Sequence, residues 1–163
     1  MIEIKIYLIG MPLSGKSSVA KKLAEKLNYQ LVDIETEIEK EALMFIDEIY
    51  ALLDIETVRQ SEINILNKLL NQNENIVVAT TSDVVEKRKN KKLLDGLVIY
   101  LDTDNEVIEK RLKTSYKKFL YQGASVEELA QRRFLKYQNF ANHIVSSNKS
   151  VDETVDEILK IVT

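Results

Sequence analysis

The sequence predicts an α/β fold, in which a mainly parallel sheet of five strands is flanked by helices. Two observations support this prediction. Short apolar segments alternate with segments whose apolar residues recur at helical spacing, the order expected of β-α-β units. The chain also has only four glycines and one proline, and three of these, Gly10, Pro12 and Gly15, lie between the first apolar segment and the first helical one.

The expected strands are short and rich in apolar residues. They span residues 3–9, 30–34, 75–80, 97–101 and 144–145. The first has the sequence EIKIYLI, with polar residues only near its start. Such a run is typical of a parallel strand that is buried on both faces.

The expected helices follow or separate these strands. They span residues 17–27, 45–70 with a break near Asp54, 105–112, 126–142 and a last segment after residue 150. In the first of them the apolar residues share one helical face. The last two begin with capping signals, because Ser125 precedes Glu128 and Ser150 precedes Glu153 by three residues.

Composition limits the possible functions. The 163 residues, 45% of them hydrophobic and 30% charged, suit one soluble domain over 1–163. The chain has no cysteine, which excludes disulfides, thiolate metal sites and cysteine nucleophiles. A net charge of -3 argues against nucleic acid as a partner, and the basic run at 87–92 is expected to be a solvated helix face. The polar segment 113–124 is either a mobile lid or a plain surface loop.

The expected cellular location and oligomeric state of the protein depend on sequence signals that are missing. No apolar run approaches the roughly 20 residues that span a bilayer, and the N-terminus lacks the features of a signal peptide. We therefore expect a cytoplasmic protein that makes no membrane contact. No partner-binding signature is visible, so a monomer is expected.

Residues 10–17, GMPLSGKS, match the phosphate-binding P-loop pattern G-x-x-x-x-G-K-[ST]. The glycines allow the backbone to curl so that its N–H groups face phosphate oxygens, and the following helix adds its positive end. Lys16 is expected to reach the β- and γ-phosphates, and the Ser17 hydroxyl to bind Mg²⁺. We expect ATP to be bound here by Gly10, Pro12, Leu13, Ser14, Gly15, Lys16, Ser17 and Ser18.

The short chain favours a small-molecule kinase over a GTPase or a motor ATPase. Those proteins are usually larger, and the base-reading motif NKxD is absent from this sequence. Phosphoryl transfer depends mainly on positioning and on neutralisation of charge. The residues that bind the acceptor must therefore lie elsewhere in the chain.

Several further motifs resemble those of the shikimate kinase family, and the resemblance covers nearly the whole chain. Asp33-Ile-Glu35 resembles the family's D-x-D, residues 46–50 its I-x-E-I-F, and residues 58–62 its F-R-x-x-E. The resemblance implies that Asp33 supports Mg²⁺ and activates the nucleophile, and that Glu35 binds substrate hydroxyls. It also implies that Arg59 clamps the substrate carboxylate and that Glu62 orients this arginine.

The second half of the chain continues the resemblance. Arg111 matches an arginine that packs against adenine, and Lys118 stands where the family has a lid arginine over the phosphates. Arg133 matches a second arginine on the substrate carboxylate, in a motif where Leu135 and Asn139 replace Pro and Glu. Arginine suits this task because its planar fork grips a carboxylate with two bonds, and the chain has only five arginines.

The resemblance implies a P-loop kinase of the nucleoside monophosphate kinase type. The implied reaction converts ATP and shikimate into ADP and shikimate 3-phosphate, in the biosynthesis of aromatic amino acids through chorismate. Lys16 and Asp33 would be catalytic, and Ser17 and Asp33 would hold Mg²⁺. The partners are then ATP and a small anionic hydroxy acid.

One departure from the family concerns the acceptor. Where the family has three glycines after the third strand, this chain has Thr81, Ser82 and Asp83, which take the substrate-binding positions here. The added side chains and the carboxylate would crowd an anionic substrate, and the carboxylate could neutralise one of the two arginines. Three alternatives follow. The acceptor is still shikimate, it is another small anionic or polyhydroxy compound, or the chain binds nucleotide and has lost kinase activity.

Overall fold

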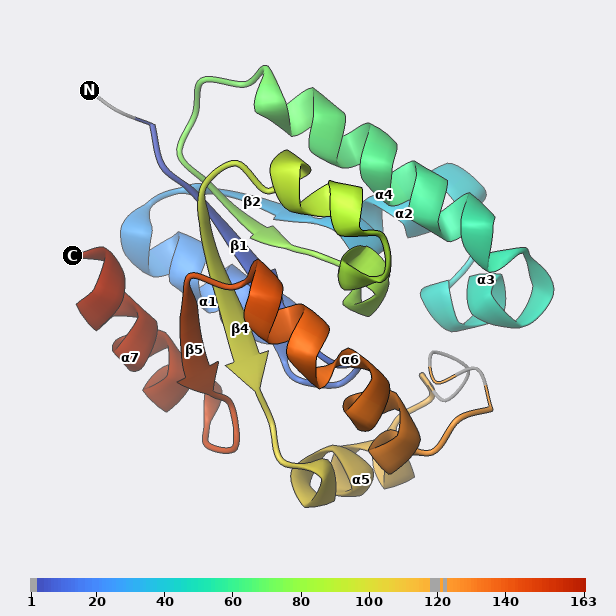
Figure 1. The fold of residues 1–163 in the computed structure, drawn as a ribbon. Helices are drawn as coiled ribbons and strands as arrows, with labels where there is room; N and C mark the ends of the chain where they lie inside the picture. The colour runs from blue at the N-terminus through green and yellow to red at the C-terminus, as the bar shows by residue number, and fades with distance from the viewer. Residues whose placement is uncertain (1–2, 118–120, 122) are drawn as a thin grey trace.

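Five parallel strands form one sheet in the order β2-β3-β1-β4-β5. A computed structural model describes residues 3–117, 121 and 123–163 (Figure 1). The strands are β1 (Lys5–Ile9), β2 (Gln30–Asp33), β3 (Ile76–Ala79), β4 (Leu97–Asp102) and β5 (His143–Ser146). The expected parallel sheet is therefore confirmed.

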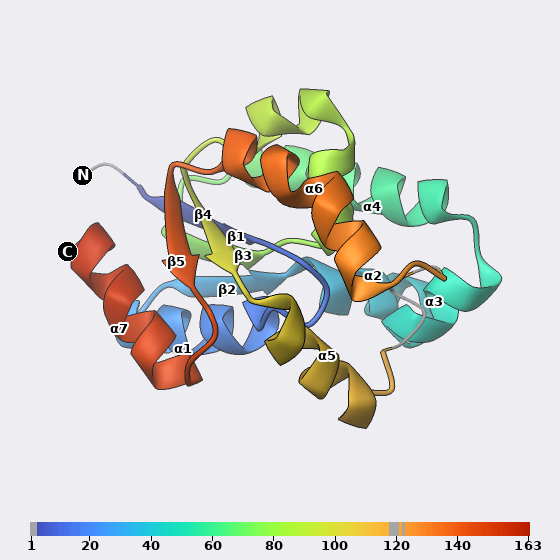
Figure 2. The same ribbon diagram turned by 60° about the horizontal axis from the view of Figure 1, so that its bottom comes forward.

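Helices cover both faces of the sheet (Figure 2). The helices α1 and α7 lie on one face, and α4 and α6 lie on the other. Along the chain the helices are α1 (Lys16–Leu27), α2 (Ile34–Ala42), α3 (Ile46–Leu52), α4 (Ile55–Leu70), α5 (Asn105–Thr114), α6 (Val126–Phe140) and α7 (Val151–Val162). Two short 3₁₀ helices, η1 (Ser82–Glu86) and η2 (Arg88–Leu93), follow β3.

Alternation along the strands builds two apolar cores. In β1, Ile6 and Leu8 pack toward α1 and α7, whereas Tyr7 and Ile9 pack toward the other face. All four side chains are fully buried. This explains why the strand is apolar at consecutive positions, since each of its faces needs a hydrophobic surface.

The parallel register brings three loops together at one edge of the sheet. Asp33 at the end of β2 pairs with Ala79 at the end of β3, and Ala79 pairs with Leu8 of β1. The residues that follow β1, β2 and β3 therefore lie side by side beyond the carboxyl ends of the strands. Ligands of open α/β sheets bind at this edge.

Most of the expected boundaries agree with the structure to within two residues. The break near Asp54 is confirmed, because its side chain caps α4 by accepting a 3.1 Å bond from the Glu56 N–H. The capping residues Ser125 and Ser150 likewise accept bonds from the N–H groups three residues later. The basic run at 87–92 belongs largely to η2 and exposes most of its charged side chains, as expected.

The helix α2 was missing from the sequence-based expectation. Only Ile34 and Ile38 are buried in this highly acidic segment, so its apolar stripe is too thin to recognise. The structure shows what starts the helix: the Asp33 side chain caps it by accepting a bond from the Thr36 N–H at 3.4 Å.

The segment expected to form a lid is described only in part. Residues 113–114 end α5, and Gly123 has a left-handed backbone with φ 81°. Lys118 lies outside the described residues. In the described part of the chain, no helix combines the length and the apolar character needed to cross a membrane.

Candidate active site

The P-loop connects β1 to α1 and depends on two glycines. A Cβ atom on Gly10 would lie 2.8 Å from the Ser14 Oγ and 2.9 Å from the Leu101 carbonyl oxygen, closer than real contacts allow. Gly15 has φ 97° and forms the N-cap of α1. The spacing of the motif is therefore imposed by a close approach at one end and by a left-handed residue at the other.

Lys16 carries a buried positive charge into this loop. Its Nζ donates 2.8 Å bonds to the carbonyl oxygens of Gly10 and Met11. Burial lowers the pKa of Lys16 to about 8, against the opposing effect of the Glu35 carboxylate. An anion bound at the loop would stabilise the buried charge of the Lys16 ammonium, so the site favours phosphate.

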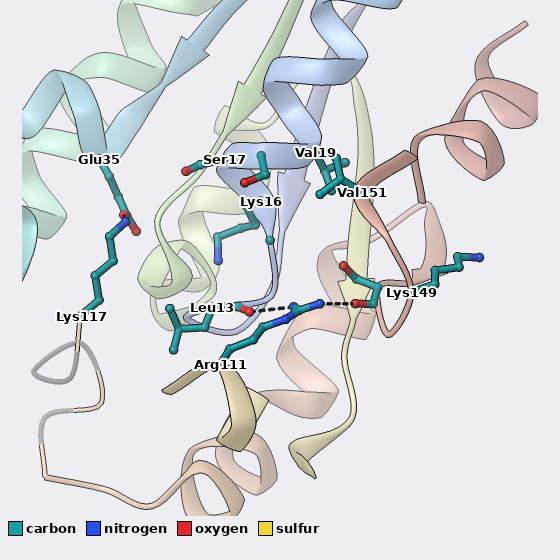
Figure 3. Close-up of a pocket in the computed structure, with 12 residues that line it drawn as sticks. Leu13, Lys16, Ser17, Val19, Glu35, Arg111, Lys117, Lys149 and Val151 are labelled. Atoms are coloured by element: carbon teal, nitrogen blue, oxygen red, sulfur yellow. Dashed lines mark hydrogen bonds and ion pairs between the residues drawn. The ribbon is translucent and has the colours of Figure 1, made fainter. Parts of the chain in front are cut away.

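A pocket of about 310 Å³ lies over the P-loop and the start of α1 (Figure 3). It brings together six residues that the sequence assigned to ATP: Leu13, Gly15, Lys16, Ser17, Ser18 and Arg111. Of the remaining four, Gly10, Pro12 and Ser14 form the buried body of the loop, and Lys118 lies outside the described residues. The Tyr121 hydroxyl fixes this body by donating to the Pro12 carbonyl at 2.9 Å.

Arg111 joins the P-loop to the segment after β5. Its NH1 donates to the Leu13 carbonyl at 2.9 Å, and its NH2 donates to the Ser147 carbonyl at 3.0 Å (Figure 3). Ser147, Lys149 and Val151 complete the lining of the pocket on this side. Sequence reasoning missed these three residues, because only the order of the strands in space places the end of β5 near the loop.

Lys117 reaches across the pocket toward α2. Its Nζ lies 3.4 Å from a carboxylate oxygen of Glu35, and the two side chains point toward each other in Figure 3. Burial raises the pKa of Glu35, and Lys117 opposes this effect. The sequence indicated Lys118 as the cation above the phosphates, and its neighbour Lys117 is the one that the structure describes at the pocket.

Ser17 and Asp33 line a second hollow of about 460 Å³ beside the P-loop pocket. Ser17 stands in the exposed first turn of α1, and Asp33 at the end of β2. Within the described residues, no three histidine, cysteine or acidic side chains are grouped to hold a metal ion. One hydroxyl and one carboxylate are nevertheless the hard oxygen donors that suit Mg²⁺ when phosphates supply further ligands.

The loop after β3 is held by a buried carboxylate. Glu62 of α4 accepts a 2.7 Å bond from the Thr81 N–H and lies 2.6 Å from the Thr81 hydroxyl. Burial raises the pKa of Glu62 to about 8. The carboxylate expected to orient Arg59 thus binds Thr81 instead, which corrects the role implied by the family motif.

Arg59 and Arg133 converge, as their assignment to one carboxylate requires, but the carboxylate between them belongs to Asp83. The NH2 of Arg133 donates to Asp83 Oδ1 at 2.8 Å, and the Nε of Arg59 lies 3.7 Å from Oδ2. The Tyr50 hydroxyl adds a 3.3 Å bond to Oδ2. Thr81, Ser82 and Asp83 are all buried, so the added side chains face protein groups.

Comparison with known proteins identifies the family. The model of the shikimate kinase family matches residues 12–163. The chain belongs to this family. It is similar to the shikimate kinase of Persephonella marina (strain DSM 14350 / EX-H1), with 34% identity over 94% of this chain and 96% of the relative. That of Bacillus cereus (strain AH187) is 28% identical, with 94% of each chain covered.

Solved structures of shikimate kinases share the fold. The enzyme from Acinetobacter baumannii in complex with shikimate superposes with a TM-score of 0.88 at 25% identity, over 98% of this chain and 93% of that one. The enzyme from Aquifex aeolicus gives 0.80 at 25% identity, over 98% and 96%. Membership of the family makes the protein an ATP-dependent phosphotransferase, in agreement with the P-loop around Lys16.

Proposed function

We propose that this protein transfers the γ-phosphate of ATP to the 3-hydroxyl of shikimate. The observation that carries the proposal is the P-loop with its buried Lys16, in a chain that matches the shikimate kinase family over residues 12–163. The related structure from A. baumannii was solved in complex with shikimate. Such a kinase serves the biosynthesis of aromatic amino acids.

The positions of the side chains support the roles that we propose for them. Lys16 compensates charge on the transferring phosphoryl group, because its ammonium is buried in the loop. Asp33 ends β2 next to the P-loop helix, where its carboxylate can accept a proton from the attacking hydroxyl. Glu35 is poised to bind acceptor hydroxyls, and Arg111 lies on the nucleotide side.

Mg²⁺ would be held by Ser17 and Asp33 together with the nucleotide. The ion would neutralise phosphate charge and orient the phosphates. Lys117, which already spans from the end of α5 to Glu35, helps to close the pocket over the reacting groups and to exclude water. We assign the same task to Lys118.

The experiment is ADP release by the purified protein with Mg²⁺-ATP, with and without millimolar shikimate. Shikimate-dependent release, and its loss in Lys16→Ala, would support the proposal. ATP binding without shikimate-dependent release would refute shikimate as the acceptor. Turnover that survived Lys16→Ala would refute the role given to Lys16.

A second candidate is a kinase for another small anionic or polyhydroxy acceptor. The contact between Asp83 and Arg133 favours it, because an internal carboxylate already binds an arginine that the substrate was expected to use. A screen of such acceptors, followed by ATP consumption, separates the two candidates. The third alternative, nucleotide binding without catalysis, predicts no transfer to any of them.

A further inference from the structure

Arg59, Arg133 and Asp83 form a cluster of charged side chains at the loop after β3. Arg133 is 1% exposed and Asp83 0% by side chain, so their 2.8 Å ion pair is fully buried. Arg59 approaches the same carboxylate from α4 with its side chain 19% exposed. Burial opposes the charge on Arg133, but the neighbouring Tyr137 hydroxyl and Asp83 carboxylate raise its pKa, so the guanidinium stays charged. Both arginines therefore approach the buried carboxylate of Asp83.

Asp83 satisfies these arginines only in part. The Nε atoms of Arg59 and Arg133 are both buried and have no hydrogen-bond partner. Glu86 lies 3.7 Å from each of the two guanidinium groups, but its short contact, at 2.8 Å, is with the more exposed Lys136. Arg59 NH1 also donates to Glu56 at 3.2 Å. Groups of the protein thus already occupy donors with which the two arginines would bind a carboxylate of the substrate.

We propose that Asp83 is a built-in substitute for the carboxylate of the acceptor, and that it sets the specificity of the acceptor site. This inference rests on the proposed function. With Asp83 between Arg59 and Arg133, the carboxylate of shikimate adds little to binding, and the hydroxyls of the ring provide most of the recognition. The site therefore accepts a neutral polyhydroxy ring nearly as well as an acidic one.

The position of Asp83 supports this inference. It lies in η1, four residues after the end of β3, at the edge of the sheet where Asp33 and the P-loop also meet. The Thr81 hydroxyl accepts a 3.2 Å bond from the Asp83 N–H, and the same hydroxyl lies against the Glu62 carboxylate. The loop thereby holds the carboxylate against the arginines in a fixed place, which a flexible glycine loop could not do.

The first test compares shikimate with its methyl ester, which lacks the negative charge. In the wild-type protein the ratio of kcat/KM for the acid to that for the ester should be within about threefold of one. In Asp83→Gly and Asp83→Asn this ratio should rise at least about tenfold, because a charge-assisted bidentate bond becomes available to the acid. Asp156→Asn, on the exposed face of α7, is the matched control and should leave the ratio unchanged.

A strong preference of the wild-type protein for the acid would overturn the proposal. So would an unchanged ratio in both Asp83 variants, since Asp83 would then be only a structural ion-pair partner. Both variants are needed because Asp83→Gly leaves Arg133 buried without its carboxylate, which destabilises the fold. Asp83→Asn keeps the size of the side chain.

A second test needs no turnover, so that it separates this inference from the proposed function. Melting temperatures are measured in sodium acetate and in sodium chloride of equal concentration. Acetate should raise the melting temperature of Asp83→Gly relative to chloride and should leave the wild-type protein and Asp156→Asn unchanged. Equal melting temperatures of Asp83→Gly in both salts would contradict the proposal. If shikimate is not phosphorylated but acetate stabilises Asp83→Gly, the proposed acceptor fails and the placement of Asp83 stands.

Discussion

The low pKa of Lys16 predicts that nucleotide binding takes up a proton. In the free protein, burial lowers this pKa to about 8, so part of the ammonium is neutral in mildly alkaline buffer. Phosphate oxygens next to Nζ would favour the charged form and return the pKa toward or above its ordinary value. The protein should then bind a proton together with ADP.

The size of this uptake follows from the pKa. With a pKa of about 8 in the free protein, uptake should be about 0.1 proton at pH 7, about 0.5 at pH 8 and about 0.9 at pH 9. Calorimetry in buffers of different ionisation enthalpy measures it directly. The titrations should be carried out at pH 8 and above, where the phosphates of ADP are fully ionised and take up no proton themselves.

Two variants assign the proton to Lys16. Lys16→Met should bind ADP more weakly and without proton uptake. Lys149→Met removes another cation from the lining of the pocket and should keep the uptake with the same midpoint. Binding enthalpies of the wild-type protein that did not depend on the buffer at pH 8.5 would refute the reasoning, as would a full uptake in Lys16→Met.

Three further predictions concern individual side chains. Asp33→Asn should lower kcat for phosphoryl transfer by about 10²–10⁴-fold, because asparagine cannot accept the proton of the attacking hydroxyl. The melting temperature should change little, because asparagine can also cap α2. A near-normal rate would show that Asp33 takes no part in catalysis. The pKa of Glu62, raised to about 8, means that the folded state keeps a proton that the unfolded state loses, so the unfolding free energy should fall as pH rises from about 5 to 8. Urea titrations should show this slope flattened in Glu62→Gln, and an unchanged slope would contradict the assignment. Arg111→Met should lower the unfolding free energy by about 1–3 kcal/mol, because two bonds to main-chain carbonyls are lost; an unchanged urea midpoint would show that they contribute nothing.

The sequence was sufficient to predict the sheet and the position of the P-loop between its first strand and first helix. Both rest on local patterns, since consecutive apolar residues mark a buried strand and fixed glycine spacing marks the P-loop. Gly10 shows why such a pattern is informative. A Cβ atom at this position would come too close to Ser14 in the same loop and to Leu101 near the end of β4, so that only glycine fits. Helix α2 could not be predicted from such a local pattern, because its apolar face consists of two buried residues.

The sequence could not place groups that meet only through the fold. Lys117 and Glu35 are 82 positions apart, and Arg111 reaches Ser147 across 36. Nothing local in either pair indicates the contact. Likewise the motif around Arg59 suggested that Glu62 serves the arginine, whereas the substitution at position 81 supplies a hydroxyl that lies 2.6 Å from the carboxylate.

The loop after β3 shows how one set of substitutions changes a site without dismantling it. Replacing glycines by larger residues costs space, and burying a carboxylate costs free energy unless it is paired. Here the hydroxyl of Thr81 lies against Glu62 and the carboxylate of Asp83 pairs with Arg133, so that these two added polar groups contact side chains of other elements. Because Arg133 and Arg59 now face Asp83, the chemistry at the P-loop can remain that of a phosphotransferase while the choice of acceptor depends on one side chain.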